Sequence, residues 1–488
     1  MISVYLWIML IIFLIAMVYL SYIAAKKTTT IEDFAISGAN LGPYVLGLSF
    51  AATFFSAATF MGYPGYSYAW GYSNLWMFLG QFGGGALGII AVGKVVRELN
   101  KSQKSLSLPD WLGDYYNSDF LRIGTGIIML FNIFYIAAQF TAGAQIFSKM
   151  LGFSYIGGLV FIALIVVGYV FAGGSYADVY TDAVQAIIMA ITGVIVFVSG
   201  IVIFGNGSIT KAFTNITDNL ASQDINLVKV INPESGNYYG VYVIAAIFII
   251  QFAFSSQPQL FNKVLSLKNP KDLRKMIITY MVTAVLCLVV LFGGLYARAA
   301  LPSIELADLA LLEYVTWGMP AILAAIVGVV ILAASLSTTD GIFVVISTVF
   351  ANDIYRKVLV KRGIIQADEE KSNRVALKIS RWTVIIVGII AFLIVLNPPQ
   401  FMADLMWIGI AGVSSGTMGP LLYAVFTRKK ASPRAAELSM VIGLFSYLII
   451  YFGGFERSLM ASGAWATLIG IIIMWGMAFI LKRPASDG

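Results

Sequence analysis

The chain has no histidine, a single cysteine and few charged side chains. Without histidine, a His-ligated metal site and a histidine proton relay are excluded, and with Cys287 alone no disulfide can form within the chain. Charged residues make up 11% of its 488 residues, whereas soluble globular proteins carry about 25%. This shortage of charge argues against a soluble enzyme, a nucleic-acid-binding protein and a disordered tail.

Apolar residues are abundant instead and make up 59% of the sequence. A helix needs about 20 apolar residues to cross a bilayer, and the apolar runs predict thirteen such segments. They cover residues 3–25, 43–66, 74–97, 121–148, 155–172, 177–204, 239–262, 273–297, 319–352, 378–396, 401–426, 435–453 and 460–481. We therefore expect an all-α integral membrane protein in a lipid bilayer, with no soluble domain and no obligate protein partner.

The basic residues are distributed unevenly among the predicted loops. If the N-terminus lies outside the cell, the inner loops hold 26 Lys and Arg residues and the outer loops hold five. The positive-inside rule predicts this bias, so the net charge of +7 indicates cytoplasmic loops rather than a nucleic-acid partner. Because thirteen is odd, the C-terminus is predicted to be cytoplasmic, in a multi-pass protein of the cell (plasma or inner) membrane. The first segment lacks a basic leader and a cleavage site, which indicates a retained helix.

Polar residues interrupt the second segment, where lipid would leave an irregular backbone without hydrogen-bond partners. Thr53 and Ser56 lie among small residues there, and Pro64-Gly65 follows. A helix unwound between Ala52 and Ser56 would free carbonyl oxygens for a cation. The same pattern also fits a packing face whose hydroxyls bond back to the helix.

The seventh segment contains three glutamines and two serines within residues 251–259. Pro258 removes a backbone donor and disfavours helical conformation at the residue before it. The stretch either lines a cavity or marks a helix end at the membrane surface, since Lys263 follows soon after.

The ninth segment carries a narrow polar face. Ala334, Ser337, Thr338 and Gly341 are spaced so that they share one side of a helix. Their oxygen atoms suit a hard cation. Asp340 lies near the same face, and an acid within a membrane helix indicates a functional site unless it makes a structural hydrogen bond.

The start of the sixth segment holds two further acids. Asp182 is a neighbour of Thr181 and Gln185 on a helix, and we expect it to be buried and paired. Asp178 lies closer to the predicted cytoplasmic surface, where it is expected to be solvated or salt-bridged.

The two interrupted segments, the second and the seventh, each begin a group of five. Interrupted segments at matching places in two halves indicate an inverted-repeat transporter, because an odd number of crossings forces the second half to insert upside down. One transmembrane domain over 1–488 is thus predicted. Its parts are an extra N-terminal helix (3–25), a first five-helix repeat (43–204), an inverted second repeat (239–426) and two C-terminal helices (435–481).

Several short motifs, spread over the length of the chain, occur together. Gly173–Gln185 resembles a Gly-Gly…Ala-Val…Trp-Thr-Asp…Gln signature, and Ser337-Thr338 followed by Asp353-Ile-Tyr resembles a Ser-Thr…Asp-Leu-Tyr stretch. Ser37-Gly38, Leu41-Gly-Pro43 and Met61–Gly65 also match. Over roughly residues 1–482 the chain resembles the sodium/solute symporter family, which includes proline, pantothenate, acetate, sialic-acid and sodium-glucose carriers. The resemblance implies a leucine-transporter-like 5+5 inverted repeat.

The resemblance also implies a sodium site. Its ligands would be the backbone carbonyls of Ala52, Phe55 and Ala334 and the hydroxyls of Ser337 and Thr338. These positions lie in the second and ninth segments, where the residue pattern is already interrupted or polar.

Some members of the family hold a second cation near the aspartate that corresponds to Asp182. Here Asp340 and Gly341 stand where hydroxyls would be expected. A second sodium is thus expected to be rearranged or absent, with a proton on Asp340 as the alternative. Proline carriers have an aspartate where this chain has Phe54, which makes proline a less expected solute.

We therefore expect a sodium-coupled symporter that imports a small organic solute, with a monocarboxylate or amino acid favoured over a sugar or vitamin. The alternatives are a proton-coupled carrier of the same fold, a channel and a sensor domain. An enzyme is not expected, since no acid pair resembles a protease dyad. The predicted solute pocket has apolar walls, to which Phe54 is also expected to contribute. Its predicted residues are Thr53, Ser56, Phe78, Gln81, Gln251, Phe254, Ser255 and Gln257.

Overall fold

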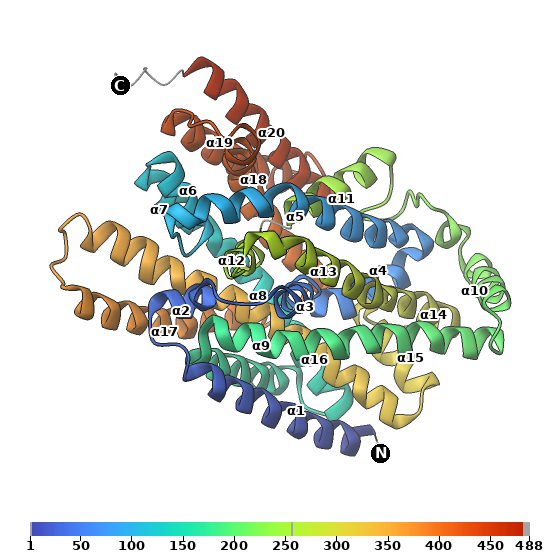
Figure 1. Ribbon diagram of the computed structural model, residues 1–488. Helices are drawn as coiled ribbons and strands as arrows, with labels where there is room; N and C mark the ends of the chain where they lie inside the picture. Colours follow the sequence, from blue (N-terminus) through green and yellow to red (C-terminus); the bar gives the residue numbers. More distant parts are fainter. Residues whose placement is uncertain (1, 255–256, 482–488) are drawn as a thin grey trace.

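The computed structural model describes residues 2–254 and 257–481. Over these residues the fold is helical, and the sole β-type pairing is an isolated bridge between Leu41 and Leu267. Most of the long helices run side by side (Figure 1). The all-α expectation is confirmed for the described part of the chain.

The helices of the first half begin at the N-terminus with a long apolar rod. They are α1 (Ile2–Ala25), α2 (Ile31–Ile36), α3 (Pro43–Phe54), α4 (Tyr63–Trp70), α5 (Leu75–Gln103), α6 (Leu108–Tyr116), α7 (Asp119–Ile128), α8 (Asn132–Leu151), α9 (Tyr155–Gly205) and α10 (Ile209–Gln223). Those of the second half are α11 (Val241–Phe254), α12 (Pro258–Leu265), α13 (Leu273–Leu288), α14 (Phe292–Ala300), α15 (Ala310–Gly318), α16 (Ala321–Thr348), α17 (Glu369–Ile394), α18 (Met402–Thr427), α19 (Pro433–Phe452) and α20 (Leu459–Ile480).

Ten helical runs in the described residues are long and apolar enough to cross a membrane, and there are eleven if the bent pair α11–α12 forms one span. Two shorter apolar helices, Pro43–Phe54 and Tyr155–Gly168, fall below that length. The molecule is thus a polytopic helical membrane protein. The count of thirteen segments stays a prediction.

The break in the second segment is confirmed. Helix α3 ends at Phe54, and the next residue, Phe55, has φ −98° and ψ 86°, which is not helical. After Ser56 the chain resumes in a wide helical turn over Ala58–Gly62 that leads into α4. Two half-helices therefore meet inside the bundle, which is the first of the two interpretations that the small and hydroxyl-bearing residues there allow.

A second break lies within α9. Gly174 has φ 56° and ψ −162°, so the helix kinks where the predicted segments 155–172 and 177–204 adjoin. A Cβ at this position would lie 2.7 Å from Cδ2 of Phe34 in α2. Glycine is required here by both its backbone conformation and this close approach.

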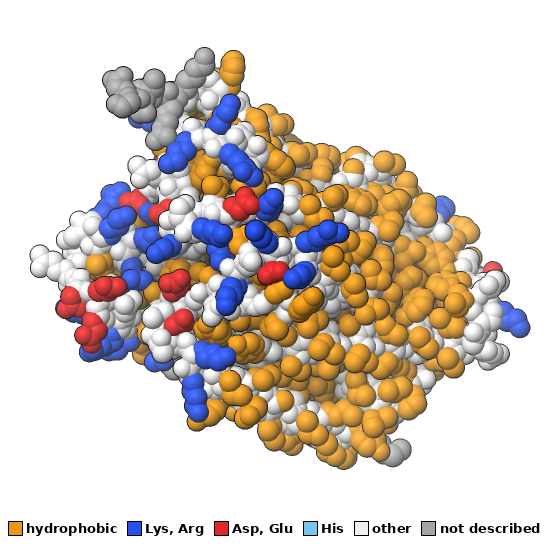
Figure 2. Space-filling model, viewed as in Figure 1, with side chains coloured by type: hydrophobic (Ala, Val, Ile, Leu, Met, Phe, Trp, Pro, Cys, Tyr) orange, Lys and Arg blue, Asp and Glu red, His pale blue; other side chains and the backbone are white. Residues whose placement is uncertain are grey.

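Charge is concentrated at one end of the molecule. Figure 2 shows lysines and arginines gathered over the end that holds α2, α6 and α7, whereas apolar side chains cover most of the remaining face. The exposed apolar residues include Ile12, Leu164 and Ile472, each more than half exposed. Such a surface suits contact with lipid tails.

Candidate functional site

The break after α3 lies against the polar face of α16. The hydroxyl of Ser337 donates to the carbonyl of Ala52 at 2.9 Å and to that of Ala334 at 3.0 Å. The hydroxyl of Thr338 donates to the carbonyl of Thr53 at 3.1 Å. All five residues are fully buried. Oxygen atoms from two distant parts of the chain therefore meet inside the protein.

This arrangement can hold a small hard cation. Each hydroxyl now donates its proton to a carbonyl, and rotation of the hydroxyl would turn its lone pairs toward an ion lying between the same oxygens. Phe55 leaves the helical conformation, so its carbonyl no longer points along the helix axis. The structure thus brings together Ala52, Ala334, Ser337 and Thr338, and places Phe55 at the adjoining break.

Asp182 of α9 is fully buried and heavily hydrogen-bonded. Its Oδ2 accepts from the hydroxyls of Ser49 at 3.0 Å and Thr53 at 2.8 Å. The ammonium group of Lys263 lies 2.8 Å from the same oxygen. The expectation that Asp182 is buried and paired is confirmed. Because Thr53 also lies in the α3 half-helix, this group adjoins the Ser337–Ala52 contact.

Lys263 was not predicted to take part in this site. It is 2% exposed and pairs with Asp178 as well as with Asp182. Of the two predicted states of Asp178, the salt-bridged one is confirmed, and the solvated one is wrong because the residue is buried. The surface position suggested by Lys263 is also wrong. Pro258 begins the new helix α12, which continues inside the protein.

Asp340 lies on α16, one turn after Ser337, and is 2% exposed. The neighbouring Gly341 packs toward three helices. A Cβ at Gly341 would lie 3.2 Å from Cβ of Gln259 and 3.5 Å from Oδ1 of Asp178. The second half of α16 therefore passes beside the lysine–aspartate group.

Aromatic rings form one wall near the two breaks. The ring of Phe254, at the end of α11, lies 4.4 Å from that of Phe54 between centroids. It also lies 6.3 Å from the rings of Tyr135 and Trp407. The Tyr135 hydroxyl faces Ser56 and Thr338. An apolar wall at Phe54 and Phe254 was predicted, whereas Tyr135 and Trp407 were missed.

The predicted amides differ in their surroundings. Gln81 is fully buried, and its amide atoms make no hydrogen bond among the described residues. The Gln251 amide lies 3.2 Å from the sulfur of Met77, and its oxygen is likewise unpaired within residues 2–254 and 257–481. Gln257 instead donates to Ser414 at 3.0 Å on α18. Gln81 and Gln251 therefore have hydrogen-bonding capacity left for a solute.

The predicted hydroxyls are already engaged. Thr53 donates to Asp182, and Ser56 accepts from the backbone N–H of Ala58 at 3.1 Å. Phe78 is half-buried and packs against the core. Ser255 lies outside the described residues.

Gln139 of α8 was also missed by the sequence reasoning. Its Oε1 accepts from the backbone N–H of Ala57 at 3.1 Å, directly at the break. Its own carbonyl accepts from the Ser335 hydroxyl on α16 at 2.9 Å. A signal was available, because Tyr135 and Gln139 are polar residues at i and i+4 in the apolar segment 121–148.

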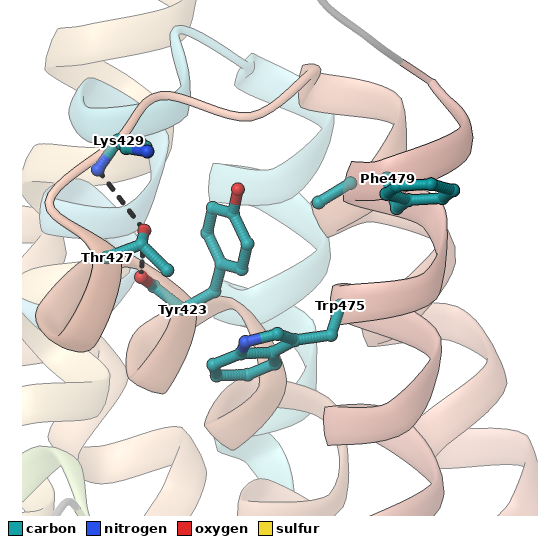
Figure 3. Close-up of a pocket in the computed structure, with 6 residues that line it drawn as sticks. Tyr423, Thr427, Lys429, Trp475 and Phe479 are labelled. Carbon is teal, nitrogen blue, oxygen red and sulfur yellow. Dashed lines mark hydrogen bonds between the residues drawn. The ribbon is translucent and has the colours of Figure 1, made fainter.

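A separate cavity of about 510 Å³ lies between α18 and α20 at the basic end of the molecule (Figure 3). The rings of Tyr423 and Trp475 lie 5.3 Å apart on its lining, and Thr427 and Lys429 stand at its rim. Aromatic and apolar groups dominate this cavity. It holds none of the predicted site residues.

Sequence comparison finds related transporters over most of the chain. A profile of the sodium:solute symporter family matches residues 34–443. The chain is 27% identical over 490 residues to the osmoregulated proline transporter OpuE of Bacillus subtilis, covering 97% of this chain and 94% of that protein. It is 25% identical over 435 residues to the sodium/pantothenate symporter of Haemophilus influenzae, with coverage of 88% and 86%.

A solved structure shows a similar fold. It is described as the substrate-bound outward-open state of a Na+-coupled sialic acid symporter. The TM-score is 0.78 at 18% identity, and the match covers 99% of this chain and 98% of the other. At this identity the likeness extends to the fold.

Proposed function

Because the chain belongs to the sodium:solute symporter family, whose profile covers residues 34–443, we propose that it imports a small organic solute by sodium-coupled alternating access. Its relatives are transporters and not enzymes, and sodium is the coupling ion of the family. The observation that carries the proposal is the contact of Ser337 with Ala52, because it joins the α3 break to α16 through oxygen atoms.

In the proposed mechanism, sodium binds between the carbonyls of Ala52, Phe55 and Ala334 and the hydroxyls of Ser337 and Thr338. Binding stabilises the arrangement in which the two helices are held together and the adjoining solute pocket is formed. Release into a cytoplasm low in sodium removes this bias. The coupling is reciprocal, so solute raises sodium affinity by the same factor. At a membrane potential of 100 mV, each inward charge contributes about 2.3 kcal/mol.

A second sodium at Asp182 is not part of this proposal. The ammonium of Lys263 already lies against Asp182 and Asp178 and supplies positive charge there. A further cation would need to displace a buried ammonium group, which is unfavourable unless the lysine moves. The transport cycle then uses one sodium ion, and Asp340 is the candidate for a proton in the alternative, proton-coupled cycle.

The proposed architecture is the 5+5 inverted repeat. Residues 3–25 form the extra helix, 43–204 and 239–426 the two repeats, and 435–481 the C-terminal pair. The interrupted pairs α3–α4 and α11–α12 begin the two repeats, which supports the assignment. The charge distribution supports an N-terminus outside and a C-terminus in the cytoplasm (Figure 2).

For the solute we propose a monocarboxylate or amino acid first, and a sugar or vitamin next. The proteins named as proline and pantothenate carriers support this range. Phe54 leaves the pocket more apolar than an aspartate would, which disfavours proline. Among the described residues, Gln81 offers an unpaired amide and Gln251 an unpaired amide oxygen, and Phe254 offers the apolar wall.

The test is a ligand screen on the purified full chain. Melting temperature is measured with small metabolites in sodium chloride and, in parallel, in choline chloride and potassium chloride. A solute that stabilises the protein in sodium alone, and is then accumulated by proteoliposomes under an inward sodium gradient, supports the proposal. Equal accumulation in all three salts contradicts sodium coupling, and accumulation driven by a pH gradient points to the proton-coupled carrier. Uptake that does not saturate and shows no counterflow indicates a channel.

A further inference from the structure

A groove at the basic end of the molecule combines an apolar floor with a cationic rim. It lies between the later turns of α5 and the start of α13, and its volume is about 580 Å³. Three cations, Lys94, Lys271 and Arg274, line it together with apolar side chains that include Ile278 and Met281. A space of this size is within the range of small-molecule sites, about 300–1,000 Å³.

The cations of the rim are weakly neutralised by the protein. The Lys94 side chain is 68% exposed, and its one carboxylate neighbour, Glu98, lies 3.9 Å away and is shared with Arg428 at 3.7 Å. Among the described residues, no Asp or Glu lines the groove itself. The nearest acid in the chain before Arg274 is Asp272, and it bonds Lys275 at 2.9 Å. The rim therefore presents three positive charges around one opening.

Other hollows on the apolar surface lack this feature. One of about 340 Å³ lies among α5, α11, α18 and α20, and another of about 430 Å³ lies beside α9 and α13. Within the part of the chain that the structure describes, neither has a charged residue in its lining. The cations thus distinguish the α5–α13 groove from hollows that lipid tails alone can fill.

We propose that this groove binds an anionic phospholipid of the cytoplasmic leaflet, which rests on the orientation given above. The phosphate lies among Lys94, Lys271 and Arg274, and an acyl chain follows Ile278 and Met281 toward the membrane interior. A basic rim at the end of apolar helices matches an anionic phospholipid. Its negatively charged headgroup contacts the cations, and its hydrocarbon chain contacts the apolar side chains.

The position of the groove connects it with the transport machinery. Arg97 of α5 donates to the carbonyl of Leu267 at 2.6 Å, in the loop between α12 and α13. A Cβ at Gly93 would lie 3.3 Å from Leu273, so α5 and α13 are closely packed. A lipid that bridges α5 and α13 stabilises this packing beside α12, which carries Lys263. Occupancy therefore raises the stability of the protein and alters its transport rate.

The experiment compares two triple variants of the full chain. The groove variant is Lys94→Gln, Lys271→Gln and Arg274→Gln. The control removes three exposed lysines at the same end of the molecule but outside the groove, namely Lys361→Gln, Lys371→Gln and Lys378→Gln. Melting temperature in detergent is followed during titration with phosphatidylglycerol and, separately, with phosphatidylcholine.

The wild type and the control variant are expected to be stabilised by phosphatidylglycerol more than by phosphatidylcholine. The groove variant is expected to bind phosphatidylglycerol about fivefold more weakly for each charge removed. In vesicles of equal phosphatidylcholine and phosphatidylglycerol, its transport rate should fall to the rate of the wild type in phosphatidylcholine alone. Equal weakening in both variants would assign the effect to general surface charge and overturn the proposal. Unchanged binding in the groove variant would overturn it as well.

A conservative change at Arg274 tests whether its positive charge is the property that the lipid recognises. Arg274→Lys keeps the charge and is expected to retain the preference for phosphatidylglycerol, whereas Arg274→Gln is expected to weaken it. Since all three cations are exposed, their replacement leaves the buried core unchanged, and a normal gel-filtration profile checks this. Loss of preference in Arg274→Lys would show that charge is not the recognised property.

Discussion

The hydroxyl of Ser337 lies 2.9 Å from the carbonyl oxygen of Ala52, although 285 residues separate them in the chain. One residue belongs to a continuous helix, α16, and the other to the last turn of a half-helix, α3. A cation held between such oxygens would make the relative position of the two helices depend on its presence.

Replacement of Ser337 or Thr338 by alanine should raise the sodium concentration for half-maximal uptake about tenfold. Each change removes one of the proposed oxygen ligands, and a hydrogen-bond-type contact to a charge contributes about 1.5–3 kcal/mol. Sodium-dependent uptake at a fixed solute concentration measures the effect. Thr339→Ala is the matched control, since that hydroxyl bonds back to Ser335 within α16. If the control shifts as much as the site variants, the assignment is wrong.

Removal of the Lys263 charge should destabilise the protein strongly. Lys263→Met leaves Asp178 and Asp182 buried without their cation, and breaking a buried pair in this way costs about 3–5 kcal/mol. The free energy of unfolding in detergent is the measurement. Adding Asp178→Asn and Asp182→Asn to Lys263→Met should recover part of the stability. No recovery would mean that the lysine acts through packing alone.

Gln139→Ala should weaken sodium binding although Gln139 is not a predicted ligand. The change leaves the buried N–H of Ala57 without its acceptor, a loss of about 1–3 kcal/mol, and frees the break to move. We expect a several-fold rise in the sodium requirement and a smaller rise with Gln139→Glu, which keeps an acceptor oxygen. Gln145→Ala, further along α8, is the control and should bind sodium normally.

The burial of the Asp308 carboxyl group predicts that the stability of the protein depends on pH. It lies in the loop between α14 and α15, is 1% exposed, and accepts a hydrogen bond from the backbone N–H of Met402 at 2.7 Å. Burial raises its pKa from 3.8 to about 7; the neighbouring carboxylate Asp404 adds to this and the Met402 bond opposes it. Because the folded protein holds this proton more tightly than the unfolded chain does, the contribution of Asp308 to stability is greatest below pH 3.8 and is lost as the pH rises toward 7.

The fall attributable to Asp308 amounts to about 4 kcal/mol over that range. Asp308→Asn should remove it, so the variant gains stability relative to the wild type at pH 7 more than at pH 4. Unfolding in denaturant at both pH values measures the difference. Asp218→Asn, at an exposed position of α10, should change neither value. An Asp308→Asn variant that follows the wild type at every pH would contradict the argument.

The sequence predicted those parts of the fold that depend on local pattern. The interruption between Ala52 and Ser56 was visible because small and hydroxyl-bearing residues replaced long apolar ones, and the structure breaks α3 at Phe54. The junction of the fifth and sixth segments was visible from the glycines near Gly174, where α9 kinks. Membrane insertion, helix content and the charged end follow from composition in the same way.

The partners of the buried polar groups were not predictable from local pattern. The sequence left open whether the stretch before Lys263 lines a cavity or ends at the membrane surface, because nothing in it shows that α12 continues inside the protein after Pro258. Gln139 and Tyr135 were overlooked in an otherwise apolar run. Their roles depend on the side of α8 that faces the break, which is set by packing against α16 and α18.

The sequence by itself determined that this chain lies in a membrane and where polar residues interrupt its apolar spans, because lipid excludes uncompensated polar groups along every span. Only the tertiary structure decided that Asp182 pairs with Lys263 and that Gln139 bonds the backbone at the break. Such pairings join residues that are about 80 positions apart in each case. They arise because a buried charge or N–H must find its partner in space, whatever the distance along the chain.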